Sequence, residues 1–130
     1  MILLLAGNIT TTNLLTNAIW SFEEQGIIEN VRSGDVNRKK AIEEVLRYRS
    51  PIQEIQHVVR EDIELGGQQI EAGEIVNIWV GAANRDPEVF DDPESFRPEA
   101  HGLEPVIMRG NGRQRWAGFF KYIIRAGILT

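Results

Sequence analysis

The segment from Met108 to Gly118 limits what this chain can fold into more than any other, because it carries glycines at positions 110, 112 and 118. Glycine adopts positive φ and lets the backbone approach a ligand or another segment closely. Gly110 and Gly112 therefore predict a tight turn that packs against something flat or bulky. The apolar run that follows the loop predicts a helix over residues 119–129.

Composition places the chain among single globular domains. Its 130 residues, 42% of them hydrophobic, would bury roughly two-thirds of the unfolded surface in a compact fold. A net charge of −5 without a long run of like charge gives no support for a nucleic-acid or anionic-membrane partner. Because the apolar run 2–6 is too short for a membrane span or a signal peptide, and the chain has no cysteine, we expect a soluble cytoplasmic protein.

Two segments carry the spacing of helices. Apolar residues recur at steps of three and four over residues 1–24, which predicts one long helix that is either amphipathic or largely buried. The three threonines that begin at Thr10 favour a local distortion there, because their hydroxyls compete for carbonyls one turn back. Residues 37–49 predict a second helix that ends before Pro51.

From residue 52 the apolar period changes to that of strands. Glycine-containing turns at 66–67 and 72–73 predict a small antiparallel hairpin sheet over 52–80. The strands are expected over residues 52–59, 62–65, 68–70 and 74–80. Residues 87–108 contain four prolines and predict a long irregular meander, a length that in a compact domain usually belongs to a functional segment.

Several short motifs follow one another along the chain. They are the threonine-marked helix, Glu-x-x-Arg at Glu44 and Arg47, Tyr48-Arg49-Ser50-Pro51, the hairpin sheet, Ala83-Asn84-Arg85-Asp86-Pro87, Phe96-Arg97-Pro98-Glu99 and the Gly-x-Gly-x-x-x-x-x-Gly loop. Their joint order resembles the C-terminal portion of a cytochrome P450, the haem-thiolate monooxygenase family, of the soluble bacterial or archaeal kind.

The resemblance covers nearly the whole chain and implies an α+β fragment of a mainly α fold. By this resemblance residues 1–130 are a single partial domain, and the chain is less than half as long as members of the family. Its expected parts are a distal helix (1–24), a Glu-x-x-Arg helix (37–49), a hairpin sheet (52–80), a meander (87–108), a haem loop (109–118) and the start of the last helix (119–129).

The long helix acquires a role from this resemblance. Ala6, Gly7 and Thr10 match the helix that crosses the haem, where the threonine hydroxyl helps to deliver protons to iron-bound dioxygen in this family. Thr10 is thus the expected proton-relay residue. The acid that usually precedes this threonine is replaced by Ile9, which cannot carry a proton.

Glu44 and Arg47 stand three apart on one helix face, and spacing alone leaves an exposed ion pair open. The resemblance makes them the buried pair that fastens the haem-side core, with Asn84 and Arg85 as further structural positions. In the family an arginine from the meander usually completes the pair, and here that position is Ala100. A dry pair without its third member would have unsatisfied donors or acceptors.

His57 falls where the family commonly has an arginine that pairs with a haem propionate. An imidazole is only partly charged at neutral pH and donates more weakly to a carboxylate. The residue three positions earlier, often basic in the family, is Glu54, which would repel a propionate.

The glycine loop aligns with the family's haem-binding segment. Arg109, Gln114 and Trp116 replace an aromatic residue, a basic residue and the cysteine that ligates iron. An indole has an N–H donor but no lone pair for a metal, and no cysteine elsewhere can supply the thiolate. The haem-contact positions that the resemblance implies in the loop are Gly110, Gly112, Gln114 and Gly118.

Several interpretations remain open. The resemblance implies haem, a ferredoxin or flavoprotein electron donor and a small apolar substrate, and we expect a family member that is truncated and catalytically inactive alone. The alternatives are a pseudoenzyme that keeps haem or ligand binding, half of a split protein, a scaffold or interaction module, and an unrelated α+β domain. Ligation of haem by His57 or His101 is a further hypothesis.

Overall fold

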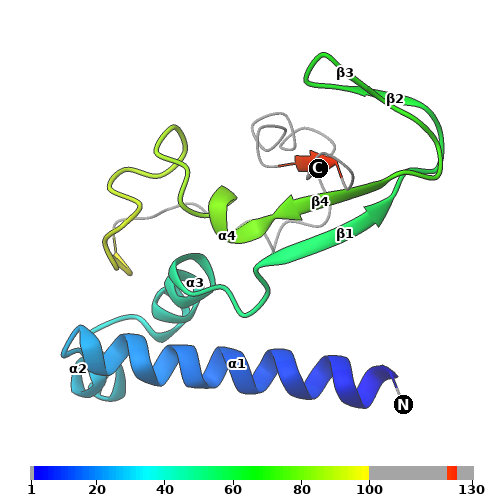
Figure 1. The fold of residues 1–130 in the computed structure, drawn as a ribbon. Coiled ribbons are helices and arrows are strands. Elements are labelled where there is room, and N and C mark those ends of the chain that lie inside the picture. Colours follow the sequence, from blue (N-terminus) through cyan, green and yellow to red (C-terminus); the bar gives the residue numbers. More distant parts are fainter. Residues whose placement is uncertain (1, 100–122, 126–130) are drawn as a thin grey trace.

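The computed structural model describes the backbone of residues 2–99 and 123–125 and the side chains of residues 6–99. Three helices come first along the chain, and short strands on either side of a fourth helix follow them (Figure 1). In chain order they are α1 (Ile2–Glu24), α2 (Ile28–Ser33), α3 (Arg38–Tyr48), β1 (Glu54–Val58), β2 (Ile63–Leu65), β3 (Gln68–Ile70), β4 (Ile75–Trp79), α4 (Val80–Ala83) and β5 (Ile123–Arg125).

The long helix α1 matches the segment predicted for it, and the hydroxyl contacts expected from its threonines are present. The hydroxyl of Thr10 donates to the carbonyl of Ala6 at 2.7 Å, and that of Thr11 donates to Gly7 at 2.6 Å. These bonds go to carbonyls one turn back, which an α-helix tolerates without losing its own ladder. The helix therefore continues unbroken through the threonine run.

Helix α2 was not predicted from the sequence. It is only six residues long and ends at Gly34, which has a φ of 96°. Helix α3 begins one residue after Asn37, whose side chain accepts a hydrogen bond from the backbone N–H of Lys40 at 3.2 Å. This N-cap confirms the start predicted for the Glu-x-x-Arg helix.

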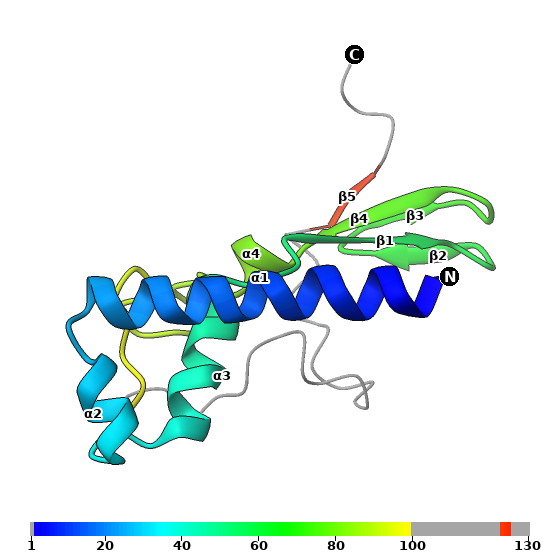
Figure 2. The ribbon, with the colours of Figure 1, turned by 90° about the horizontal axis from the view of Figure 1, so that it is seen from below.

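The first core lies where α1 crosses α3 (Figure 2). Ala18 and Phe22 of α1 pack against Ala41 and Val45 of α3, and all four side chains are buried. Phe96 from the meander joins them with its ring 6.3 Å from that of Phe22. The C-terminal half of α1 is thus fixed to α3 and the meander.

The predicted hairpin sheet is two sheets. Strands β1 and β4 pair antiparallel, with His57 opposite Val76, while β2 and β3 form a separate two-stranded hairpin. A second core of Val59, Ile70 and Val76 joins the hairpin to the larger sheet. The turn at Gly66 and Gly67 has positive φ at both positions, as a two-residue hairpin requires.

The helix predicted over residues 119–129 is wrong for the part that the structure describes. Residues 123–125 form β5, which pairs antiparallel with β4 and places Ile124 opposite Asn77. An apolar run of β-branched residues is compatible with either state, and here the open edge of β4 provides hydrogen-bond partners. The rest of that run, residues 100–108 of the meander and the glycine loop 109–118 lie outside the described residues.

Candidate functional site

Glu44 and Arg47 form a buried ion pair at the centre of the described fold. The Nε and Nη2 groups of Arg47 donate to the two carboxylate oxygens of Glu44 at 2.8 and 2.7 Å. The side chains are 1% and 3% exposed, so the exposed alternative is excluded. A two-point contact of this kind fixes the planes of both groups.

The remaining donors of Arg47 bind backbone carbonyls. Nη1 donates to Asn84 at 3.1 Å and to Pro93 at 2.8 Å, and Nη2 donates to Ser95 at 2.8 Å. Together with the contacts to Glu44, these bonds use all five N–H groups of the guanidinium. The expectation of unsatisfied donors on Arg47 was therefore wrong, because carbonyls of the meander bind them.

Glu44 also holds the meander directly. One of its carboxylate oxygens accepts the backbone N–H of Arg97 at 2.8 Å. The ion pair therefore connects α3 to residues 84–97 through main-chain groups. Ala100, the position of the family's third member, lies outside the described residues.

Side chains from three other segments cap the C-terminal end of α3. The buried amide of Asn84 donates to Leu46 at 3.3 Å, and Arg85 donates to Tyr48 at 3.0 Å. These contacts give both predicted structural residues a physical role, because the last carbonyls of a helix lack partners within the helix.

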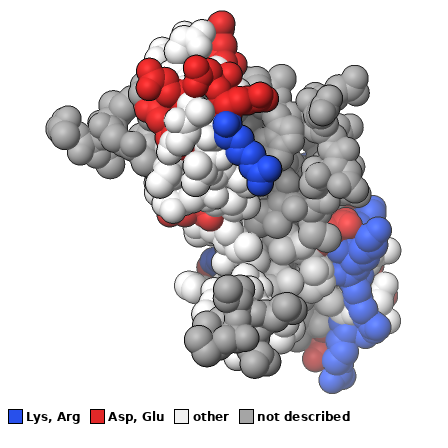
Figure 3. Space-filling view, turned by 90° about the vertical axis from the view of Figure 1, so that its right-hand side faces the viewer, with Lys and Arg blue, Asp and Glu red and all other residues white. Residues whose placement is uncertain are grey.

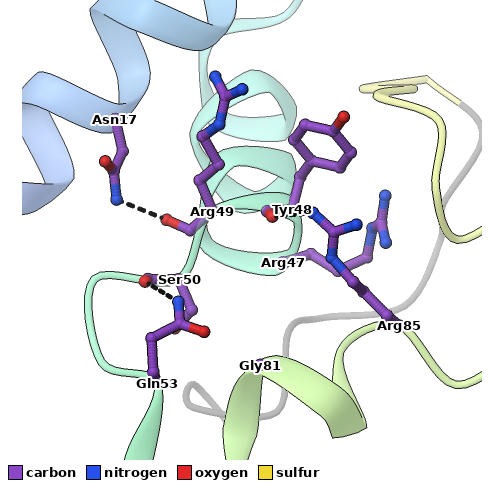
Figure 4. Close-up of a pocket in the computed structure, with 8 residues that line it drawn as sticks. All are labelled: Asn17, Arg47, Tyr48, Arg49, Ser50, Gln53, Gly81 and Arg85. Atoms are coloured by element: carbon purple, nitrogen blue, oxygen red, sulfur yellow. Dashed lines mark hydrogen bonds between the residues drawn. The ribbon is translucent and has the colours of Figure 1, made fainter.

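Two further caps were not found from the sequence (Figure 4). Asn17 of α1 donates to the carbonyl of Arg49 at 2.8 Å, and Gln53 donates to that of Ser50 at 2.7 Å. Nothing in the spacing of Asn17 marks it, since its partner lies 32 residues later in the chain. The position of Gln53 directly after a helix and a proline is a weak signal of a cap.

These capping residues line a pocket of about 260 Å³. Three guanidinium groups contribute to its wall, but their strongest contacts are already with the protein: Arg47 with Glu44, Arg49 with Glu24 and Arg85 with Glu94. The arrangement is that of a structural junction between α1, α3 and α4. The lining residues are Asn17, Arg47, Tyr48, Arg49, Ser50, Gln53, Gly81 and Arg85.

Stacking contacts extend this junction to the surface. The guanidinium of Arg85 lies 4.7 Å from the ring centre of Tyr48, and that of Arg49 lies 4.2 Å from the ring of Trp20. Tyr48 also meets Phe96 edge-on at 5.6 Å. Such contacts add to the attachment of α1 on the end of α3.

The predicted proton-relay position lies on α1, apart from the residues that line the pocket. Thr10 is half-buried and its hydroxyl proton is committed to the carbonyl of Ala6. Gly7 is exposed, and a Cβ at Gly7 would meet nothing within 4 Å. Ile9, in place of the family's acid, is exposed.

His57 is exposed on β1 and faces the same side of the sheet as its partner Val76. Glu54 stands three residues earlier and points to the opposite face, because side chains alternate along a strand. The repulsion of a haem propionate by Glu54 stays a prediction. His57 belongs to no group of three or more metal-ligating side chains within the described part of the chain.

Charge is distributed unevenly over the strands. Acidic side chains gather at the end of the molecule where the β2–β3 hairpin lies (Figure 3). Two of them stabilise the hairpin, since Asp62 accepts the N–H of Ala72 at 2.8 Å and Glu74 accepts that of Glu71 at 2.9 Å. This cluster therefore has a structural explanation.

The carboxyl group of Glu99 has a lowered pKa. The Nζ of Lys40 donates to the carboxylate of Glu99 at 2.8 Å, and this hydrogen bond lowers the pKa of Glu99. The pair is exposed and joins α3 to the end of the described meander. It contributes a second, weaker attachment next to the buried one.

The chemistry of the donor set does not fit a haem-thiolate centre. The chain has no cysteine, and the loop positions expected to contact haem, Gly110, Gly112, Gln114 and Gly118, lie outside the described residues together with Trp116. Among the described helices none is long and apolar enough to cross a membrane.

Comparison with known proteins identifies a family. The model of the family described as cytochrome P450 matches residues 38–102, which is half of the chain. The matched segment begins with α3 and includes the Glu44–Arg47 pair, the capping residues Gln53, Asn84 and Arg85, and the backbone carbonyls that bind Arg47. The motifs between Glu44 and Glu99 lie in the matched segment, whereas the threonine-marked helix and the glycine loop lie outside it.

The relatives are several times longer than this chain. Cytochrome P450 119 of Sulfolobus acidocaldarius is 41% identical over 112 residues, which is 86% of this chain and 30% of the relative. The crystal structure of CYP109B1 from Bacillus subtilis aligns with 80% of this chain and 29% of its own, with a TM-score of 0.73 and 40% identity. CYP109E1 from Bacillus megaterium, solved with testosterone, aligns with a TM-score of 0.70 and 44% identity over 81% of this chain and 29% of its own.

Proposed function

The chain belongs to the cytochrome P450 family, and from this premise we propose that it forms the haem-side C-terminal portion of such a protein without haem-thiolate monooxygenase activity. The observation that carries this proposal is the residue set of the glycine loop. Its glycines keep the family's spacing while Trp116 occupies the position of the axial cysteine. An indole donates a hydrogen bond and does not ligate iron.

The described residues support a scaffold role. The Glu44–Arg47 pair keeps the contacts that attach the meander to α3. When bound in the family, haem-thiolate activates dioxygen, and this depends on electron density that the thiolate pushes toward iron. Without a thiolate, the Glu44–Arg47 pair attaches the meander to α3 but does not supply that chemistry. On this proposal the chain alone does not oxidise the small apolar substrate of the family, and it does not use the family's ferredoxin or flavoprotein electron donor.

The proposal is tested by spectroscopy of the protein mixed with haem. After reduction and exposure to carbon monoxide, we expect no Soret band at the position of a thiolate-ligated ferrous carbonyl complex. Such a band in the wild-type protein would overturn the proposal. A Soret band of the histidine-ligated type would instead support the alternative of a haem-binding pseudoenzyme, and His57→Ala and His101→Ala would identify its ligand.

A second experiment asks whether Trp116 is the sole defect. We expect Trp116→Cys not to restore the thiolate spectrum, because Arg109, Gln114 and Ala100 are separate departures from the family's pattern. Trp116→Ser is the matched control, since it removes the same indole without adding a thiol. A thiolate spectrum from the cysteine variant alone would show that the loop still holds the haem-binding geometry.

A further inference from the structure

Strand β4 lies between two neighbours that cover it to different extents. β1 pairs with the whole of Ile75–Trp79, whereas β5 pairs only with Val76–Ile78. β4 contains no charged residue and no proline, two features that commonly keep an edge strand from pairing with another chain. The side of β4 that faces β5, which we call the β4 edge, is therefore covered by a short strand among the described residues.

The direction of the backbone groups shows which residues the β4 edge offers. Val59, directly after β1, donates its N–H to the carbonyl of Glu74 at 2.9 Å. Because backbone groups point alternately to the two sides of a strand, every second residue from Glu74 onward pairs with β1. The residues that direct their N–H and C=O groups to the β4 edge are Ile75, Asn77 and Trp79.

The side chain of Asn77 lacks a partner at the middle of the β4 edge. Its amide oxygen is buried, and no group of the described residues donates a hydrogen bond to it. A buried acceptor without a donor is unfavourable and rare in folded proteins. Ile124 of β5 is opposite Asn77, and isoleucine has no side-chain donor. β5 therefore covers the backbone of Asn77 and leaves its side-chain oxygen unsatisfied.

The sequence of β4 is nearly symmetric about Asn77, which suits pairing with a second copy of the same strand. Two β4 strands that lie antiparallel with Asn77 opposite Asn77 place Ile75 of each strand opposite Trp79 of the other. The same register places Val76 opposite Ile78. Pairs of an aromatic and a β-branched residue are favourable in sheets, and Ile75 and Trp79 are each 40% exposed. The amide of Asn77 contains a donor and an acceptor, so each copy can satisfy the other.

We propose that the β4 edge is the interface of a two-fold dimer, in which β4 of a second copy displaces β5. All three residues that direct backbone groups to this edge then pair, whereas β5 covers only Asn77 among them. Because both copies use the same surface, the assembly closes at two chains. β5 competes with the second copy for the same groups, so the dimer forms as the concentration rises. The proposal does not rest on the loss of haem-thiolate chemistry.

Sedimentation velocity of the full 130-residue chain over a range of concentrations tests the proposal. Ile124→Pro removes the N–H that β5 offers to Asn77, and we expect it to strengthen dimerisation at least tenfold. Asn77→Val in this background should weaken the dimer at least tenfold without lowering the Tm of the monomer, because the unsatisfied acceptor is lost with the amide. Gln68→Val, a similar exchange at an exposed position of β3, should leave dimerisation unchanged.

Cysteine cross-linking tests the register of the two strands. The chain has no cysteine, so each variant carries a single thiol. Ile75→Cys and Trp79→Cys should form a disulfide only when the two variants are mixed, because residue 75 of one copy lies opposite residue 79 of the other. Hydrogen-bonded positions of antiparallel strands have Cα atoms about 5.5 Å apart, a separation that a disulfide bridges. This pair leaves β5 unchanged and therefore tests the dimer independently of Ile124→Pro.

The opposite results overturn the proposal. A chain that stays monomeric with Ile124→Pro, or equal dimerisation with and without Asn77→Val, would show that the β4 edge does not pair in this way. A mixture of the cysteine variants that forms no disulfide, or unmixed variants that cross-link as readily as the mixture, would exclude the register. Large aggregates in place of a dimer would assign the association to non-specific pairing. Far-UV circular dichroism of each variant checks that the fold is retained.

Discussion

The end of α3 and the N-terminal half of α1 are opposite kinds of region in one small structure. At the end of α3, a buried charge pair and four main-chain carbonyls all have partners within the described residues. On α1, residues 6–13 are mostly exposed although none of them is charged. The difference teaches that buried contacts in the described residues gather where the C-terminal half of α1 meets α3, while the N-terminal half of α1 adds few of them.

The largest effect is expected at Arg47. Arg47→Ala would leave the carboxylate of Glu44 buried without its cation, and such a loss costs about 3–5 kcal/mol. Arg47→Lys retains the charge but has three donors in place of five, so we expect a loss of at least about 2 kcal/mol. Urea denaturation followed by circular dichroism measures both.

Glu44→Gln in the Arg47→Ala background is the control for this effect. If the penalty arises from an uncompensated charge, the double variant should be more stable than Arg47→Ala alone. Equal stability of the two would contradict that explanation and assign the loss to missing packing.

A smaller effect is expected from the caps of α3. Asn84→Ala removes the donor to the buried carbonyl of Leu46, which costs about 1–3 kcal/mol. Asn17→Ala removes a half-buried contact between α1 and the end of α3 and should cost about 1 kcal/mol. Asn13→Ala, an exposed asparagine on the same helix, is the matched control, and a loss as large as that of Asn17→Ala would show that helix propensity and not the cap is responsible.

The exposed half of α1 should tolerate a charge. Ile9→Glu places an acid at the position where the family has one, and we expect the free energy of unfolding to change by less than about 0.5 kcal/mol. Thermal denaturation of the isolated chain measures this. A loss of several times that size would mean that residue 9 is packed in solution, and the contrast between the two regions would then be smaller than the structure indicates.

The smallest effect is expected at the exposed pair of Lys40 and Glu99. Because the hydrogen bond from Lys40 lowers the pKa of Glu99 in the folded state, its contribution is present above the ordinary carboxyl pKa and is lost as the pH falls through the lowered value. Lys40→Gln should return the pKa of Glu99 toward its ordinary range. An NMR titration of the Glu99 carboxyl group checks this, and an unchanged pKa would contradict the assigned cause.

The sequence predicted the parts of the fold that rest on local pattern. Helix α3 begins at Arg38, within one residue of the start predicted at 37, and the turn at Gly66 and Gly67 joins β2 to β3. Periodicity could not predict α2, because six residues give too few repeats to show a helical pattern. It also gave the wrong state for residues 123–125, since whether an apolar run forms a helix or a strand depends on the neighbouring edge of β4.

The side-chain pair of the candidate site was predicted from the sequence, but its backbone partners were not. The spacing of Glu44 and Arg47 and the family's motifs indicated the pair, but the acceptors of its remaining donors are backbone carbonyls of Asn84, Pro93 and Ser95. Main-chain groups carry no sequence signature, so this set of acceptors is visible only in three dimensions. Likewise, Glu54 and His57 are close in the sequence, but side chains alternate along β1, so these two point to opposite faces of the strand.

The contacts of Arg47 can form only in a certain order while the chain is being synthesised. Its last described acceptor, the carbonyl of Ser95, follows it by 48 residues. During synthesis Arg47 can pair with Glu44 early, but its contact with Ser95 can form only after that residue has left the ribosome, and contacts over such separations form slowly. The full set of partners of this one guanidinium therefore exists only after the meander has packed against α3.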